Sequence, residues 1–213
     1  MEIFDAYRDQ IFAAFWTTIQ LTVYSAIGAL ILGTVLAAMR LAPVPVLNWL
    51  GAAYVNVVRN TPLTLLLFAV ALGMPKIDIN LSYFTFAVIA VGCYTSAVIA
   101  EAVRSGINTV PLGQAEAARS LGMTFGQTLR LVVLPQALRA VVPPVGSLLI
   151  AMVRNTAIAG GFNVLELLGQ YRLLLEYHDV LWVFFWIAVG YLIITLTLSA
   201  FFAFLERRLA VAR

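Results

Sequence analysis

The sequence predicts an all-α, polytopic membrane protein with about five transmembrane helices. Only 11% of its 213 residues are charged and 62% are hydrophobic, whereas about a quarter of residues are charged in ordinary soluble domains. The stretches 10–39, 79–100 and 180–205 contain no charged residue, and about 20 mostly apolar residues are enough for a helix to cross a bilayer. Because these apolar runs are continuous and do not alternate, they favour helices over the strands of a membrane β-barrel.

Five spans account for the whole pattern, and we expect residues 1–213 to form a single transmembrane domain. The prolines of the segment 42–45 end the first span, and Gly73-Met74-Pro75 ends the second. The second span is interrupted by Arg59 and Pro62. The predicted spans are about Phe12–Met39, a stretch within Leu47–Leu72, and about Tyr83–Val103, Ala137–Ile158 and Val180–Phe204.

The distribution of basic residues predicts the orientation, because cytoplasmic loops of membrane proteins carry an excess of Lys and Arg. Five spans place the termini on opposite sides. With the N-terminus outside, only three basic residues fall outside, namely Arg8, Lys76 and Arg172. Eight fall inside, namely Arg40, Arg104, Arg119, Arg130, Arg139, Arg207, Arg208 and Arg213. The chain is therefore expected to have its N-terminus outside and its C-terminus inside.

The loop between the third and fourth spans, at about 111–135, predicts a helix–turn–helix. Pro111 suits the first position of a short helix, and Gly122 suits its C-terminal stop. Thr124 and Gln127 have the spacing of a capping box that opens a second short helix, and Pro135 separates this helix from the fourth span. The alternative interpretation is an amphipathic connector lying on the membrane surface.

The tetrapeptide Val-Arg-Asn-Thr occurs twice within apolar sequence, at 58–61 and at 153–156. A charged side chain in a membrane is costly and is expected to face the bundle interior or a watery cavity. Thr61 could cap a helix with Pro62 at its first position, which would aim a helix N-terminus at an anionic substrate group. The predicted substrate-pathway residues are Arg59, Asn60, Thr61, Arg154, Asn155 and Thr156.

Two other interpretations of these arginines remain open. Arg59 could extend to the lipid headgroups from a span that starts at Pro62. Arg154 could pair with an acid, such as Glu101 or Glu166, and only hold the bundle together. Glu101 itself is predicted to pair with Arg104, which lies one helical turn away.

The loop also carries a recognisable motif. Glu116-Ala117-Ala118 is followed after three residues by Gly122, and after nine more by Val132-Val133-Leu134-Pro135. This pattern resembles the signature of the permease subunits of ABC importers. The surrounding stretches 101–122, 58–63 and 153–158 look like the polar amino acid branch of that family, so the resemblance extends over essentially the whole chain. One departure is Ala157, where a serine is common in relatives.

The resemblance implies that ATP binding, the translocation pathway and substrate delivery belong to different subunits. A pair of ATP-binding subunits would dock on Glu116, Ala117, Ala118 and Gly122, and two permease chains, alike or different, would form the pathway. An extracytoplasmic binding protein would deliver the amino acid, and an acidic one such as glutamate is the first guess because of the membrane arginines. The permease would lie in the bacterial cytoplasmic membrane, surrounded by lipid, and no nucleic-acid partner is expected.

The residues also argue against activity of the chain by itself. Its single lysine, Lys76, follows Pro75 and does not belong to the Gly-rich phosphate-binding motif of ATPases. We therefore expect no cofactor on this chain, with ATP and Mg²⁺ on the partner subunit. Cys93 and His178 are the only residues of their kinds, so neither a metal site nor an intramembrane enzyme is expected. The remaining alternative is a self-sufficient secondary transporter or channel.

Overall fold

The computed structural model describes residues 2–174 and 180–209. His178, the single histidine, and Arg213, which was counted for the orientation, lie outside the described residues.

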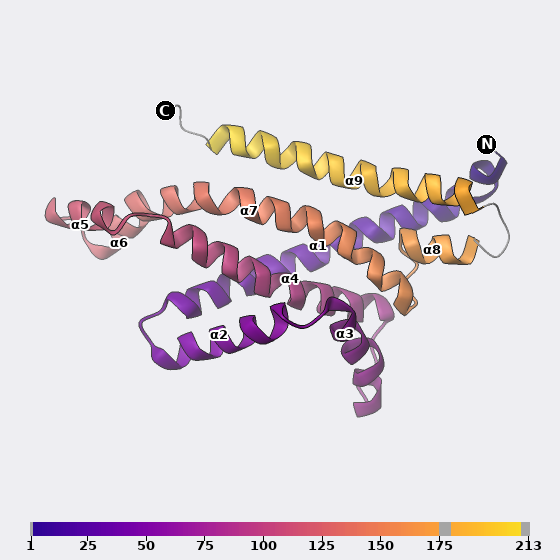
Figure 1. Ribbon diagram of the computed structural model, residues 1–213, viewed down its shortest axis with the longest axis horizontal. Helices are drawn as coiled ribbons and strands as arrows, with labels where there is room; N and C mark the ends of the chain where they lie inside the picture. Colours follow the sequence, from indigo (N-terminus) through magenta and orange to yellow (C-terminus); the bar gives the residue numbers. More distant parts are fainter. Residues whose placement is uncertain (1, 175–179, 210–213) are drawn as a thin grey trace.

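The described part of the chain is helical, without strands, and this confirms the predicted fold class. Four long helices can each cross a membrane: α1 (Glu2–Leu41), α4 (Tyr83–Asn108), α7 (Leu134–Asn155) and α9 (Val180–Leu209). The predicted second span is α2 (Pro45–Arg59) followed by α3 (Leu63–Phe68) and the helical turns that continue to Ile77. The directions of Pro45–Arg59 and Leu63–Ile77 differ by 100°. Counted as one broken span, this pair completes five (Figure 1).

Shorter elements connect and extend these helices. Two wide π-helical turns lie at Ala69–Gly73 and Leu129–Val133, and two 3₁₀ segments lie at Met74–Ile77 and Thr156–Phe162. Between the long helices lie α5 (Leu112–Ser120), α6 (Phe125–Thr128) and α8 (Leu167–Leu174). The start of α1 and α8 lie at one end of the molecule, whereas α5, α6, the α1–α2 turn and the end of α9 lie at the other (Figure 1).

Helix α4 is the centre of the bundle and packs along α1. In the most apolar part of α4, 56% of the residues are buried, compared with 17% in α9. Small residues bring α1 and α4 close together. A β-carbon added at Gly33 of α1 would lie only 2.9 Å from the backbone oxygen of Ser96 of α4, so no larger residue fits there. Lipid gives no hydrophobic drive for helix association, so such close backbone contact is a main source of helix attraction in membranes.

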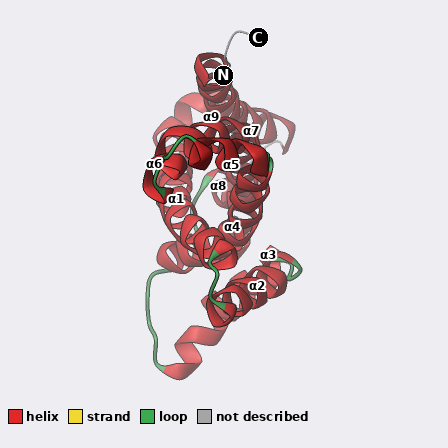
Figure 2. Ribbon diagram, turned by 90° about the vertical axis from the view of Figure 1, so that its left-hand side faces the viewer, coloured by secondary structure: helices red, strands yellow, loops and turns green. Residues whose placement is uncertain are grey.

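The remaining helices pack around this pair. Figure 2 shows α2 and α3 at one side of the bundle that contains α1, α4, α7 and α9. Helix α7 contacts both α4 and α9, so it links the bundle centre to the peripheral helix.

Candidate coupling surface and translocation segments

The turn after α5 has the geometry that was predicted for Gly122. Its φ angle is +84°, a left-handed conformation in which glycine is favoured. The Gly122 N–H donates to the Arg119 carbonyl at 2.9 Å, and the Met123 N–H donates to the Ala118 carbonyl at 3.2 Å. This pair of hydrogen bonds is a Schellman motif, which ends the helix and turns the chain sharply.

The start of α6 also has the predicted capping box. The Gln127 N–H donates to the Thr124 hydroxyl oxygen at 3.3 Å, and the Thr124 N–H donates to the Gln127 side-chain oxygen at 2.9 Å. The two caps fix both sides of the turn. The start of α5 differs from the prediction by one residue, because the extended backbone of Pro111 (ψ 135°) makes it the residue before the helix and not the first within it.

The second short helix of the loop is not separate from the fourth span, and this part of the prediction was wrong. Residues from Phe125 to Phe162 form one continuous helical stretch. Pro135 would clash with the carbonyl one turn earlier in a regular helix and has no N–H to donate. The wide turn at Leu129–Val133 immediately precedes it and accommodates the proline without ending the helix. The loop is thus rigidly joined to α7.

The loop exposes both a charge and apolar side chains. Glu116 and Ala117 are exposed, whereas Ala118 is only 5% exposed and packs within the loop. Leu112, Leu121 and Phe125 are each more than three-quarters exposed. These three residues were not among the predicted site residues, although apolar side chains on both sides of the Gly122 turn, in a segment that leaves the membrane, are a signal that could have identified them.

The first Val-Arg-Asn-Thr segment ends α2. Asn60 donates from its side chain to the Asn56 carbonyl at 2.7 Å, and the Thr61 hydroxyl donates to the Val57 carbonyl at 2.8 Å. Thr61 therefore satisfies the carbonyls of the helix before it and does not cap α3, contrary to the prediction. Pro62 is the residue before α3, which begins at Leu63. The predicted break near Arg59 is confirmed.

Arg59 joins a cluster of charges around Glu101. The two carboxylate oxygens of Glu101 accept hydrogen bonds from Arg40 of α1 and from Arg104 of α4, which confirms the predicted Glu101–Arg104 pair. The Arg59 Nη1 lies 3.8 Å from the same carboxylate. One acid thus connects the ends of α1 and α2 to α4. The alternative in which Glu101 pairs with Arg154 was wrong, because nearer arginines surround this acid.

The second Val-Arg-Asn-Thr segment lies at the end of α7. Arg154 is exposed and forms no ion pair with any residue that the structure describes, Glu166 included, and Asn155 is half-buried. Thr156 is fully buried, and its hydroxyl donates to the Val153 carbonyl at 2.7 Å. No hydrogen bond or ion pair between described residues joins the two copies, although Phe68 after the first and Phe162 after the second have ring centroids 4.9 Å apart.

Glu166, the second acid considered as a partner of Arg154, is completely buried. Its carboxylate accepts a hydrogen bond from the Gly169 N–H at 2.7 Å, which caps α8, and another from the Tyr191 hydroxyl of α9. Burial raises the pKa of this carboxyl, although the hydrogen bond from Tyr191 acts in the opposite direction. Glu166 thus fastens the segment after α7 to α8 and α9.

The bundle and its rigid loop define a multi-pass helical membrane subunit of the permease class. Over residues 14–211 the sequence matches the family described as the inner membrane component of binding-protein-dependent transport systems. The chain belongs to this family. The comparisons support the predicted importer permease and do not support the self-sufficient transporter or channel.

Individual relatives agree with this assignment over nearly their full length. The glutamate transport system permease protein GluC of Corynebacterium glutamicum is 46% identical, and 94% of each chain is covered. The probable glutamine ABC transporter permease protein GlnM of Bacillus subtilis is 39% identical, with 97% of this chain and 94% of the relative covered. A chain in the crystal structure of an amino acid ABC transporter with histidines has a TM-score of 0.89 and 30% identity, with 95% of each chain covered.

Proposed function

We propose that this chain is the permease subunit of an ATP-driven importer of a polar amino acid, with glutamate as the first candidate. The observation that carries the proposal is the rigid loop at 111–135, whose two caps and continuous junction with α7 allow a push on the loop to move a transmembrane helix. A flexible loop would change its own conformation under the same force and would not move α7.

The choice of glutamate rests on the relatives. The most similar proteins reported above are named for glutamate and for glutamine, and the glutamate permease has the higher identity, 46% against 39%. Arg154 is exposed without an acidic partner among the described residues, so its charge is available to an anionic solute.

The proposed assembly has an ATP-binding pair, a second permease chain and an extracytoplasmic binding protein. ATP and Mg²⁺ bind to the ATPase subunits, which dock on the exposed Glu116 and Ala117. Ala118 and Gly122 act there by shaping the loop, and the exposed Leu121 and Phe125 enlarge the apolar contact. The loop and the C-terminal end of α9 face the cytoplasm, and the N-terminus faces outside.

The proposed pathway uses the six residues of the two repeated segments, namely Arg59, Asn60, Thr61, Arg154, Asn155 and Thr156. Arg59 is held by Glu101 and Thr156 is buried in this conformation. In an alternating-access cycle these two residues contact solute only in a state with a different arrangement of α2 and of the end of α7.

Purification of the chain from its native membrane tests the assembly. Co-purification of a P-loop ATPase and a second permease chain, or two copies of this one, is expected. The complex in proteoliposomes, with its binding protein and ATP, should take up radiolabelled glutamate in preference to glutamine, arginine and histidine. A chain that purifies alone and moves solute without ATP would contradict the proposal, whereas ATP-dependent uptake of another amino acid would correct only the substrate.

A further inference from the structure

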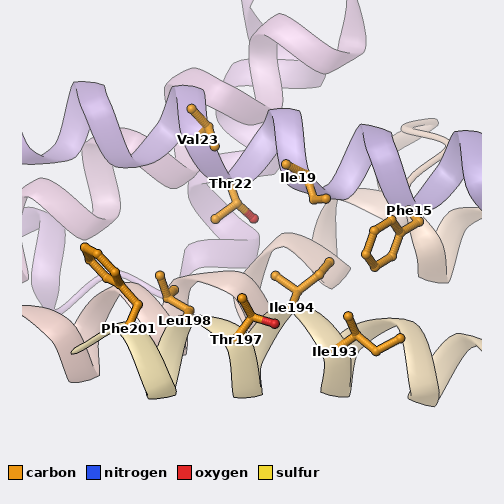
Figure 3. A pocket seen from close by; sticks show the side chains of 9 residues that line it. All are labelled: Phe15, Ile19, Thr22, Val23, Ile193, Ile194, Thr197, Leu198 and Phe201. Carbon is orange, nitrogen blue, oxygen red and sulfur yellow. The ribbon is translucent and has the colours of Figure 1, made fainter. Parts of the chain in front are cut away.

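A groove of about 430 Å³ lies between α1 and α9. Figure 3 shows the side chains of both helices pointing toward one another across it. Two threonine hydroxyls, from Thr22 and Thr197, are the only polar groups of its side chains, and no charged residue lines it. The other lining residues are Phe15, Ile19, Val23, Ile193, Ile194, Leu198 and Phe201.

The groove lies inside the membrane. Its α1 residues belong to the uncharged stretch 10–39 and its α9 residues to the uncharged stretch 180–205. Helix α9 is also the least buried of the four long helices, so this side of the bundle lies on the outer surface of the chain. An apolar groove in this position favours a hydrocarbon occupant over water.

A basic residue, Arg208, lies on α9 about two helical turns beyond Phe201, the last α9 residue that lines the groove. Arg208 follows Thr197 by eleven residues, about three helical turns, so the two project from nearly the same face of α9. The rise between them is about 16 Å, which is close to half of the roughly 30 Å hydrocarbon thickness of a bilayer. Arg208 therefore lies at headgroup depth when Thr197 lies near the bilayer centre.

The neighbouring charges lie on other sides of the helix. At about 100° per residue, Arg207 projects well away from the groove face, and Glu206 projects farther still. The Arg208 guanidinium lies 5.2 Å from the centroid of the Phe204 ring, which holds the charge close to the helix surface. A positive charge on the groove side of α9, about two turns beyond an apolar groove, matches a molecule with an anionic head and a hydrocarbon tail.

We propose that the groove between α1 and α9 binds one acyl chain of an anionic phospholipid, with the lipid phosphate beside Arg208. The lipid belongs to the leaflet at the C-terminal end of α9. Because no residue of the coupling loop or of either repeated segment lines the groove, the proposal does not depend on which solute is transported.

The test uses the full-length chain with its co-purifying subunits in mild detergent. Phosphatidylglycerol and phosphatidylcholine with identical acyl chains are the probes, and retained lipid is counted by native mass spectrometry alongside the thermal midpoint. Phosphatidylglycerol should bind and stabilise more strongly. Arg208→Gln should weaken its binding about fivefold, equivalent to about 1 kcal/mol for one basic residue at an anionic surface, and the matched Arg207→Gln should weaken it less.

A second pair of variants tests the groove itself. Thr197→Trp fills it and should abolish specific retention of phosphatidylglycerol, whereas Leu196→Trp, at a position that is 64% exposed and does not line the groove, should not. Equal binding of the two lipids, or equal retention by the two tryptophan variants, would overturn the proposal. So would a cross-link from Thr197→Cys, in a Cys93→Ser background, to another protein chain, because a protein would then cover the groove. If Thr197→Trp does not fold, the surface variant Arg208→Gln still decides the question.

Discussion

At the residue scale, the two copies of Val-Arg-Asn-Thr have different environments. Arg59 approaches a carboxylate that already accepts hydrogen bonds from Arg40 and Arg104, so it shares one acidic partner with two other arginines. Arg154 has no acidic partner among the described residues. A charge without a partner in an apolar region is costly and marks a functional site more strongly than a charge that has an acidic partner.

Replacement of the shared acid should destabilise the bundle. Glu101→Gln leaves Arg40, Arg59 and Arg104 facing one another without a counter-charge. Loss of a charged hydrogen bond costs about 1.5–3 kcal/mol, so we expect the thermal midpoint to fall by about 3–12 °C for a chain of this size, at about 2–4 °C per kcal/mol. Differential scanning fluorimetry of the purified complex measures this. Glu206→Gln, at an exposed position of α9, is the control and should cause almost no change.

Replacement of the uncompensated arginine should affect transport and leave assembly intact. We expect Arg154→Ala to lower the apparent affinity for substrate-loaded binding protein in ATPase assays by about tenfold, the equivalent of about 1.4 kcal/mol. Yield and subunit ratio should match the wild type, because no described ion pair is lost. Unchanged affinity and rate in both Arg154→Ala and Asn155→Ala would remove the second segment from the pathway.

At the element scale, the loop after α4 is a rigid part of α7. The glycine turn and the capping box each satisfy backbone groups that would otherwise be free at helix ends. The wide turn before Pro135 keeps the backbone helical through a residue that usually stops a helix. Mechanical continuity, together with the exposed Glu116, makes this element the expected point of force transmission.

Charge reversal on this element should uncouple ATP hydrolysis from uptake. Glu116→Lys places a cation where an acid is available to an ATPase groove, and we expect ATP-dependent uptake in proteoliposomes to fall at least about tenfold, because like charges in an interface cost several kcal/mol. Gln114→Lys adds a similar charge at an exposed position on another side of α5 and should retain most of the uptake. Normal uptake by Glu116→Lys would show that docking does not use this residue.

The shape of the turn can be tested apart from its charge. Gly122→Ala forces a β-carbon into the left-handed region, where it costs about 1–2 kcal/mol. We expect reduced coupling, measured as uptake per ATP hydrolysed. Gly126→Ala, inside α6 with open space around its α-carbon, is the matched control and should behave as the wild type. Equal coupling in the two variants would mean that the turn geometry does not matter.

At the scale of the whole molecule, the first and last long helices place their ends on opposite sides of the bundle. The start of α1 lies beside α8, and the end of α9 lies at the same end as α5 and α6 (Figure 1). If the coupling loop is cytoplasmic, the side of the membrane on which every other inter-helix connection lies is fixed. The orientation from the basic residues and the arrangement of the helices then give the same topology.

Cysteine labelling tests this topology. Cys93 is the single native cysteine, so a Cys93→Ser background is free of thiols. Arg8→Cys should react with a membrane-impermeant maleimide added to intact cells, whereas Ser120→Cys should react only after the membrane is opened. Both positions are exposed in the structure. The reverse pattern would invert the proposed orientation.

Three features could be predicted from the sequence alone: the membrane environment of the chain, its five spans, and the two caps of the loop. Long uncharged stretches have no alternative to helices in lipid, and the conformations required by Gly122 and Thr124 depend on residues within a few positions of each other. These features are local, so residue type and spacing were sufficient to predict them.

The long-range partners of the charges, beyond the local Glu101–Arg104 pair, and the effect of Pro135 on its helix depend on the tertiary structure. Whether Glu101 meets Arg59 or Arg154 depends on which helices become neighbours, and whether Pro135 ends a helix depends on whether a wide turn can form before it. The buried position of Glu166 likewise needs Gly169 and Tyr191 from two different helices. Such features arise from long-range packing and are absent from the periodicity of any single segment.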